Sequence, residues 1–250
     1  MTKAEIQLVR SLADKRGRDE SGLFVAEGHK FIGELAASQL RIRKIFCIGD
    51  LFAGPHVETV SPREMERLSL LKTPSDSLAL VEIPRRPFRP ERAARELVLA
   101  LDRVQNPGNL GTIIRLADWF GIRQIVCSPQ TADCYNPKVV QATMGAILRV
   151  EVHYTELVPY LAQAREKGIP VYGTFLEGEN LYTAPLSDAG IVLMGNEGQG
   201  VTAEAARYVG RKLFIPPYPA DRSGSESLNV AIATAVVCAE FRRRTAGVIG

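Results

Sequence analysis

From residue 97 onward, short apolar runs alternate with longer segments in which apolar residues recur every three or four positions. The short runs predict strands at 97–102, 124–128, 149–154, 171–175, 191–195 and 212–216. The longer segments predict helices at 110–121, 138–146, 156–168, 203–209 and 227–244. Strands separated by helical crossovers can lie parallel, so this order predicts an α/β domain with a mostly parallel sheet and helices on both faces.

The first 84 residues carry a shorter version of the same alternation. Helical spacing is found at 4–15, 29–38 and 61–70, and strand-like runs are found at 23–28, 43–49, 56–61 and 77–83. The next segment, IPRRPFRPERAAR, holds three prolines, which oppose a helix or a central strand and predict an extended, solvated connector. We therefore predict an N-terminal domain at 1–84, a basic linker at 85–95 and a second domain at 96–250.

Composition narrows the class of protein. Of the 250 residues, 46% are hydrophobic and 24% are charged, as expected for a chain that buries a core. Every apolar run is shorter than the roughly 18 residues that span a bilayer, and MTKAEIQLVR lacks the apolar stretch of a secretion signal. We therefore predict a cytoplasmic protein with no membrane partner.

The cysteines and histidines show no pattern typical of a metal site or a catalytic triad. The four cysteines form no CxxC pair and have no zinc-like spacing with the histidines, which predicts reduced, partly buried thiols and no metal. His29, His56 and His153 are interpreted as surface or structural residues. Trp119 lies at helical spacing from Ile113 and Leu116, which predicts a core or dimer contact.

The basic charge is concentrated before residue 96. Residues 1–95 hold 17 Lys and Arg against 13 Asp and Glu, whereas residues 96–250 hold 14 against 15. Arginine favours phosphate, so RNA is an expected partner, although a solvated hinge and a surface made basic for solubility are alternatives. The predicted RNA contacts are Lys15, Arg16, Arg18, Lys30, Arg85, Arg86 and Arg89.

Three polar segments each follow a predicted strand: QNPGNLGTIIR at 105–115, GNEGQG at 195–200 and IPPYPADRSGSESLN at 215–229. Ligands of open α/β sheets bind beyond the carboxyl ends of the strands. Any one segment is explained by a capped helix start, and Asn109 is expected to cap the first of them. Three such segments at one edge predict a ligand site, and the absence of GxGxxG after the first strand argues against a dinucleotide site.

Together these segments resemble the three signature motifs of the SpoU (TrmH) family of RNA ribose 2′-O-methyltransferases, in the SPOUT superfamily, over residues 97–245. The segment FVAEGHKFIGELAAS resembles the small RNA-binding domain of many members, which is similar to a ribosomal-protein α-β-α sandwich. The resemblance implies a deep C-terminal trefoil knot, S-adenosylmethionine bound in that knot, and an obligate homodimer with its active site by the subunit interface.

The resemblance also implies roles for individual residues. The catalytic set is Arg115, Asn109, Glu197, Ser227 and Asn229. The cofactor-binding set is Thr174, Gly195, Asn196, Gly198, Ile215, Pro217 and Leu228. The segment between IP and SLN is longer and more polar than in many relatives, which leaves the roles of Arg222 and Glu226 open.

The implied reaction is methyl transfer to a ribose 2′-hydroxyl, with ribosomal RNA preferred over transfer RNA as the substrate. An inactive RNA-binding module and an enzyme that methylates a base are the alternatives. A guanidinium stays protonated at neutral pH, so we predict that Arg115 binds phosphate and stabilises the forming alkoxide. A role as the base remains the other interpretation.

Overall fold

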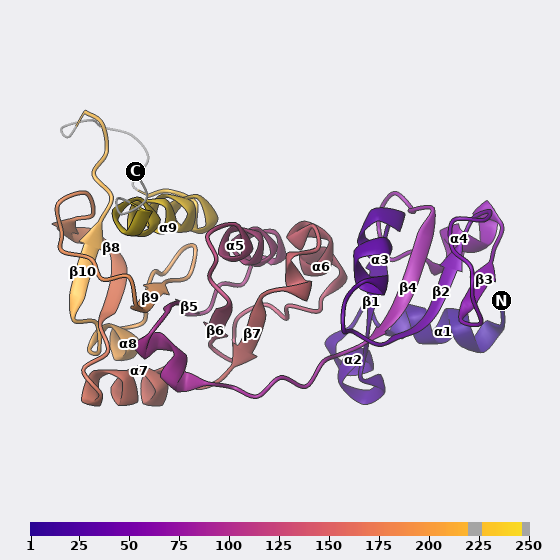
Figure 1. Ribbon diagram of the computed structural model, residues 1–250, viewed down its shortest axis with the longest axis horizontal. Helices are drawn as coiled ribbons and strands as arrows, with labels where there is room; N and C mark the ends of the chain where they lie inside the picture. Colours follow the sequence, from indigo (N-terminus) through magenta and orange to yellow (C-terminus); the bar gives the residue numbers. More distant parts are fainter. Residues whose placement is uncertain (220–226, 247–250) are drawn as a thin grey trace. The chain divides into compact units, whose positions relative to one another are not determined.

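The computed structural model describes residues 1–219 and 227–246 and divides into two compact units. The first contains Met1–Arg86 together with Asp133–Leu148, and the second contains Pro87–Ala132 together with the chain from Arg149 onward. Figure 1 labels the helices and strands of both units.

The second unit is built on a six-stranded sheet in the order β10-β8-β9-β5-β6-β7. The strands are β5 (Leu97–Leu101), β6 (Gln124–Cys127), β7 (Glu151–Tyr154), β8 (Val171–Asn180), β9 (Gly190–Met194) and β10 (Arg211–Phe214). All the pairings of these described strands are parallel, which confirms the predicted parallel α/β class. The strand β8 continues five residues beyond its predicted end at 175 and pairs with β10 in an irregular register.

Helices cover both faces of this sheet (Figure 1). The described helices are α5 (Pro107–Trp119), α7 (Leu157–Glu166), α8 (Ala203–Ala206) and α9 (Val230–Ala246). On one face, side chains of α7 and α8 pack against alternate strand residues such as Val98, Ala100 and Leu193. On the other face, α5 packs beside α9, and the rings of Tyr172 and Phe241 meet edge to face at 5.0 Å.

The linker is only partly extended. Residues 83–89 have no regular secondary structure, but Pro90–Ala94 form the 3₁₀ helix η1, whose Ala93 is buried in the second unit. The prediction of an extended connector is therefore wrong from Pro90 onward. A proline opposes helix interiors but suits a first helical turn, where its fixed φ is favourable and no N–H is needed.

The first unit is a four-stranded sheet in the order β1-β4-β2-β3. The strands are β1 (Leu23–Glu27), β2 (Ile42–Cys47), β3 (Val57–Thr59) and β4 (Ser77–Glu82). Only the pairing of β2 with β3 is parallel among these described strands. One face is covered by α1 (Lys3–Ser11) and α4 (Pro62–Leu68), and the other by α3 (His29–Ala36).

The helix predicted at 4–15 is in fact interrupted by a corner. The first helix, α1, ends at Ser11, and a second, α2 (Lys15–Ser21), begins after Asp14. A methyl group on Gly17 would overlap the Ser11 carbonyl, so the close approach at this corner requires glycine. Leu12 and Ala13 keep the helical spacing of α1, which explains why the prediction ran on to 15, and the sequence of α2, KRGRDES, holds no apolar residue that would indicate a second helix.

A distant part of the chain completes the first unit. Residues 133–148, which lie within the predicted range 96–250, form α6 (Pro137–Thr143) and η2 (Ala146–Leu148) and pack with the first unit. Val140 joins the core beneath α3, and the rings of Phe24 and Tyr135 lie 4.9 Å apart. This docking follows from tertiary packing and has no signature in the local pattern.

The four cysteines are free and buried, as predicted. Burial raises the pKa of the Cys238 thiol to about 12, so it stays protonated at neutral pH. Within residues 1–219 and 227–246, no helix has the length and hydrophobicity needed to cross a bilayer. Across the same ranges, no group of three or more His, Cys, Asp or Glu side chains is placed to hold a metal ion.

Candidate functional site at the carboxyl edge of the parallel sheet

The carboxyl ends of four neighbouring strands lie along one edge of the second unit's sheet. The strands β5, β9, β8 and β10 are parallel neighbours, so the loops that follow them emerge at the same edge. Helices α5 and α9 begin after two of these loops. At this edge the structure joins Asn109, Glu197 and Asn229, one residue from each motif, through side-chain hydrogen bonds.

Glu197 is the central acceptor of this network. Its Oε1 accepts from Asn109 Nδ2 and from the backbone N–H of Asn106, both at 3.0 Å. Its Oε2 accepts from the backbone N–H of Gln105 at 3.3 Å and from Asn196 Nδ2 at 3.4 Å. The carboxylate of the second motif therefore holds the loop of the first motif in place.

The same donors keep Glu197 ionised. Partial burial favours the neutral carboxyl, but hydrogen bonds from the Asn109 side chain and from the backbone of Asn106 and Gln105 outweigh it. Their net effect holds the pKa of Glu197 below the ordinary glutamate value. An ionised carboxylate surrounded by N–H donors is suited to positioning other groups and is a weak acceptor for a substrate proton.

Helix α5 begins earlier than the sequence predicted. Asn106 is its N-cap, and Asn106 Oδ1 accepts from the backbone N–H of Gly108 at 2.8 Å and of Asn109 at 3.2 Å. Pro107 takes the first helical position, which its fixed φ favours. The prediction that Asn109 caps this helix is therefore wrong, and the side chain of Asn109 instead joins the network.

Asn229 occupies the start of α9. Its Oδ1 accepts from the backbone N–H groups of Ala231 at 2.9 Å and Ile232 at 3.3 Å. Its Nδ2 donates to Asn109 Oδ1 at 3.0 Å. One side chain therefore satisfies the first N–H groups of α9 and links that helix to α5.

The 195–200 loop is a tight turn held by its own backbone. Asn196 and Gly200 exchange N–H···O bonds of 2.9 and 3.0 Å, and Asn196 Oδ1 accepts from the N–H groups of Gly198 and Gln199, both at 3.0 Å. Gly195 approaches the Gly200 backbone so closely that a methyl group would overlap it, and Gly200 has φ +68°. Glycine is therefore required at both ends of this turn.

Asp102, which was not among the predicted site residues, anchors the far end of this loop. Asp102 is 3% exposed, and its Oδ2 accepts from the backbone N–H and the hydroxyl of Thr202, both at 2.7 Å. Thr202 in turn is the N-cap of α8. A carboxylate placed directly after a fully buried strand was the available signal, because a buried charge needs nearby donors.

Arg103 is a second residue of this site that was not predicted. It has φ +57°, which is uncommon for a residue with a side chain and is often found at functional sites. Its carbonyl accepts from Asn196 Nδ2 at 2.7 Å, and its guanidinium donates to Gln199 Oε1 at 3.1 Å. Arg103 therefore places a positive charge between the first and second motif loops.

Two of the predicted catalytic residues, Arg115 and Ser227, make no hydrogen bond to the network through their side chains. Arg115 is exposed on α5 and forms no ion pair with the described part of the chain. Ser227 and Leu228 are exposed just before α9. Arg222 and Glu226, whose roles were left open, lie outside the described residues.

The other predicted cofactor residues lie at the ends of β8, β9 and β10. Thr174 belongs to β8, and its hydroxyl is 3.5 Å from the carbonyl oxygen of Leu193 in β9. Ile215 and Pro217 follow β10, where Ile215 is half-buried and Pro217 is exposed. The structure therefore brings these residues to the same edge as Gly195, Asn196 and Gly198.

Most of the predicted RNA contacts are exposed. Lys15 and Arg16 lie on α2, where each pairs with an acidic side chain one turn later at 2.6 Å. Lys30 is exposed at the start of α3, and Arg85 and Arg89 are exposed in the linker. All five side chains are accessible to a phosphate group.

Arg18 and Arg86 have partners inside the first unit. Arg18 is 2% exposed, and its Nε and Nη2 donate to Asp133 Oδ2 at 2.8 and 2.6 Å. Its Nη1 donates to two backbone carbonyls at the corner between α1 and α2. The prediction of a phosphate-facing Arg18 is therefore wrong, because the guanidinium is enclosed by this corner. Arg86 is half-buried and donates to the Leu148 carbonyl at 3.0 Å.

Two family models match the chain. The SpoU rRNA Methylase family matches residues 96–239, and the MRM3-like substrate binding domain matches residues 3–79. A curated relative from Bacillus subtilis (strain 168), the 23S rRNA (guanosine(2553)-2′-O)-methyltransferase RlmP, is 30% identical to this chain. The alignment covers 93% of this chain and 94% of the relative.

Solved structures show the same similarity. A TrmH-family protein from Porphyromonas gingivalis superposes with a TM-score of 0.88 at 39% identity, covering 98% of this chain and 99% of that one. An AdoMet-bound rRNA methyltransferase from Sinorhizobium meliloti superposes with a TM-score of 0.86 at 30% identity, covering 98% and 96%. The likeness therefore extends over nearly the whole of each chain.

Proposed function

Because the chain belongs to the SpoU rRNA methylase family, we propose that it transfers a methyl group from S-adenosylmethionine to a ribose 2′-hydroxyl of ribosomal RNA. The observation that carries this proposal is the convergence of Asn109, Glu197 and Asn229, from three distant motifs, at one edge of the sheet. The relative named for 23S rRNA favours ribosomal over transfer RNA as the substrate.

The residues at this edge fit S-adenosylmethionine. The 195–200 turn is so tight that residue 195 has no room for a side chain, and half-buried apolar residues follow β10 at the same edge of the sheet. Backbone amides and an apolar surface are suited to a nucleoside. When bound, this cofactor supplies an electrophilic methyl group on a positively charged sulfur. We expect Thr174, Gly195, Asn196, Gly198, Ile215, Pro217 and Leu228 to hold it.

The catalytic residues are expected to act on the RNA. Arg115 binds the phosphate beside the target ribose and stabilises negative charge on the 2′-oxygen as the proton leaves. Ser227 and Asn229 provide polar groups at the reacting centre. Glu197 and Asn109 act by positioning, since their side chains hold the motif loops together.

The active form is expected to be a homodimer. Arg115 is exposed and separate from the network of its own chain. The large apolar side chains of Trp119 and Ile232, on α5 and α9, are 83% and 54% exposed. This exposure excludes a core role for Trp119 in the single chain and favours the predicted dimer contact. A second copy that covers these helices would bury both side chains and bring Arg115 to a shared site.

The finer architecture is also part of the proposal. The second domain, 96–250, is expected to contain the trefoil knot, since β8 and β10 lie together on one side of β9 in the sheet order. The N-terminal domain, 1–84, is expected to be the ribosomal-protein-like RNA-binding domain, which its layers of helix, sheet and helix favour. The 85–95 segment links the two, and an rRNA substrate favours a cytoplasmic location.

Ribose-methylation profiling of total RNA, from cells with and without this gene, tests the proposal. We expect a ribosomal RNA ribose to lose its methyl group without the gene and to regain it when purified protein and S-adenosylmethionine are added. A profile that does not change would contradict the proposal. Calorimetry would then show whether the chain binds the cofactor at all, and mass spectrometry whether a base is methylated instead.

A further inference from the structure

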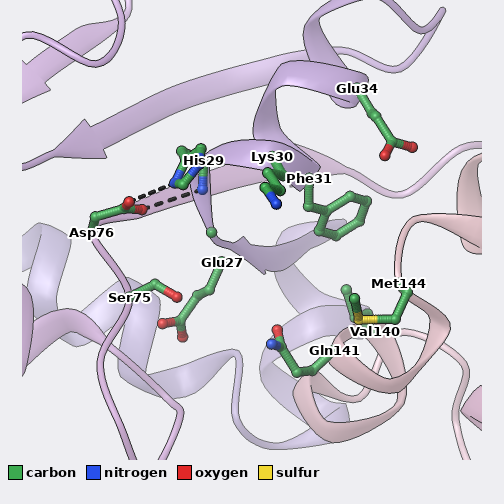
Figure 2. A pocket seen from close by; sticks show the side chains of 11 residues that line it. Glu27, His29, Lys30, Phe31, Glu34, Ser75, Asp76, Val140, Gln141 and Met144 are labelled. Carbon is green, nitrogen blue, oxygen red and sulfur yellow. Dashed lines mark hydrogen bonds and ion pairs between the residues drawn. The ribbon is translucent and has the colours of Figure 1, made fainter.

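A hollow of about 440 Å³ lies within the first unit (Figure 2). One wall is formed by the first residues of α3, with Ser75 and Asp76 before β4, and the facing wall is formed by α6. Its volume lies within the ~300–1,000 Å³ of ordinary ligand sites. Lys30 is the only predicted RNA contact among its lining residues.

His29 is held in a fixed orientation at the edge of this hollow. Asp76 accepts from the His29 backbone N–H at 3.2 Å and lies 2.6 Å from His29 Nδ1, as Figure 2 shows. Asp76 also accepts from the Ser77 hydroxyl at 2.8 Å. The backbone contact alone would cap the helix, whereas the contact to Nδ1 also orients the ring and leaves Nε2 for another partner. The side chain of His29 is 51% exposed.

The carboxylates around the hollow already have partners in the protein. Glu27 accepts from a hydroxyl and a backbone N–H of the 69–70 segment at 2.6 and 2.8 Å. Asp76 holds His29, and Glu34 is also engaged within the protein. Lys30, by contrast, forms no hydrogen bond or ion pair with the described residues. The groups available to an anion at this edge are therefore Lys30 and the outer nitrogen of His29.

The facing wall presents an amide and an apolar surface. Gln141 is exposed, and its side chain makes no hydrogen bond with the part of the chain that the structure describes. Met144 is 65% exposed and has φ +50° at the end of α6, where glycine is the usual residue. Figure 2 shows both side chains across the hollow from His29 and Lys30. An exposed thioether in a backbone conformation that disfavours it points to a role other than packing.

We infer that this hollow binds one unpaired nucleotide of the RNA, with its base against Met144 and Phe31 and its phosphate on Lys30 and His29. Gln141 then hydrogen-bonds the edge of the base. Proteins recognise RNA largely through unpaired bases laid on flat or apolar side chains, with cations on the backbone. The inference rests on the proposed function for the identity of the RNA, and the match of residues 3–79 to a substrate binding domain supports it for the wall that carries His29 and Lys30.

Paired substitutions in the intact chain test the inference. Three wall variants each remove one proposed contact from the lining of the hollow: His29→Ala, Lys30→Ala and Gln141→Ala. Their controls are His56→Ala, Lys3→Ala and Gln39→Ala, which remove an exposed residue of the same type from the same unit. The probe is 23S rRNA transcribed in vitro, and the measurements are its dissociation constant, its KM, the affinity for S-adenosylmethionine and the melting temperature. We expect each wall variant to weaken RNA binding about tenfold, or ~1.4 kcal/mol, and each control to leave it unchanged.

Met144→Gly separates an RNA contact from a structural role. Glycine relieves the positive φ, so the melting temperature is expected to stay level or rise. Loss of the side chain is expected to weaken RNA binding severalfold. A purely structural Met144 would leave RNA binding unchanged or change it only together with stability.

The outcomes distinguish this inference from the proposed function. Weaker RNA binding by the wall variants alone, with cofactor affinity and stability retained, supports the hollow as an RNA site. If the wall variants bind RNA like their controls while the wild type methylates ribose, the inference is overturned and the proposed function stands. If the wild type methylates no ribose, the proposed function is overturned, and the dissociation constants by themselves decide the inference.

Discussion

At the residue scale, the carboxylate of Glu197 suits its position because it is an acceptor surrounded by N–H donors. Four N–H donors, two from the backbone and two from Asn side chains, converge on its two oxygens. An ionised carboxylate only accepts hydrogen bonds, whereas a glutamine amide offers one oxygen and an NH₂ group that would face other donors. The charge of Glu197 therefore contributes directly to the geometry of the site.

Glu197→Gln should destabilise the protein in a pH-dependent way. Because the folded-state pKa of Glu197 is lowered, the stability from its charge is fully present above the ordinary carboxyl pKa and is lost as the pH falls through the lowered value. We expect a difference of ~1 kcal/mol in the free energy of unfolding at neutral pH, which shrinks as the pH falls below the ordinary carboxyl pKa. Urea unfolding across this range measures it.

Glu177→Gln is the matched control, since Glu177 is exposed on β8 and makes no hydrogen bond or ion pair with the described residues. Its effect should be close to zero at every pH. A Glu197→Gln difference that is constant with pH would show that the charge is not what holds the loops.

Arg115→Ala tests the residue expected to act on the ribose. Removing a donor that stabilises transition-state charge typically lowers kcat by ~100- to 1,000-fold, and we expect an effect of this size with unchanged affinity for S-adenosylmethionine. Methyl transfer to rRNA and calorimetric titration measure the two quantities. Arg207→Ala, which removes an exposed arginine beside α8, should leave both unchanged.

Turnover like that of the wild type in Arg115→Ala would refute the catalytic assignment. If the wild-type pH profile of kcat shows a titrating group that disappears in this variant, Arg115 is the base instead.

At the element scale, the site depends on where helices and strands begin and end. Helix α5 starts at Pro107 because Asn106 caps it, and this start places Asn109 in the first turn, facing the second motif. Helix α9 starts just after Asn229, whose one side chain caps it and reaches Asn109. A shift of either start by one residue would rotate these side chains by about 100° and separate them.

The turn after β9 can be tested with a matched pair of glycine substitutions. In Gly195→Ala the new methyl group overlaps the backbone of Gly200, so the turn must open. We expect a loss of ~1–3 kcal/mol in stability and weaker binding of S-adenosylmethionine. In Gly198→Ala the nearest heavy atom is Asn196 Oδ1 at 3.8 Å, so stability should change by less than ~0.5 kcal/mol.

Thermal unfolding and calorimetry measure both effects of the glycine substitutions. Equal melting temperatures for Gly195→Ala and Gly198→Ala would contradict the close approach of Gly195 to the Gly200 backbone.

At the scale of the whole molecule, the first unit is assembled from two separate stretches of chain. Residues 133–148 supply Val140 to the core beneath α3 and Tyr135 to the ring of Phe24. The ion pair between Arg18 and Asp133 closes the same junction. Cleavage of the chain at the linker would therefore not release a complete first unit. The helix α6, which packs against β1, would be separated from it.

Arg18→Ala should lower the stability of the first unit, because it removes the ion pair with Asp133 at this junction. The substitution leaves Asp133, 19% exposed, without its partner, and loss of one member of a buried pair costs ~3 kcal/mol. Arg16→Ala, two residues earlier, breaks only an exposed pair and should cost less than ~0.5 kcal/mol. Urea unfolding of the intact chain measures both, and equal midpoints would contradict the structural role of Arg18.

Sequence alone determined the class of the fold and the edge of the sheet at which the three polar segments meet. Apolar periodicity is local, so it predicted most of the helices and strands, and the helical crossovers indicated a parallel sheet. Parallel strands end at a common edge, which is why three polar segments after three strands could be expected to meet. The periodicity carried no information on the corner between α1 and α2, because α2 has no apolar residue and the close approach that needs Gly17 is a backbone contact.

Only the tertiary structure decided which partners the polar side chains have. Arg18 and Lys30 have the same charge in neighbouring segments, yet packing encloses the first against Asp133 and leaves the second at the edge of a hollow. The docking of residues 133–148 and the contact of Glu197 with Asn109 likewise join positions far apart in the chain. Such contacts depend on how whole elements pack, and a local pattern of apolar and polar residues does not encode that packing.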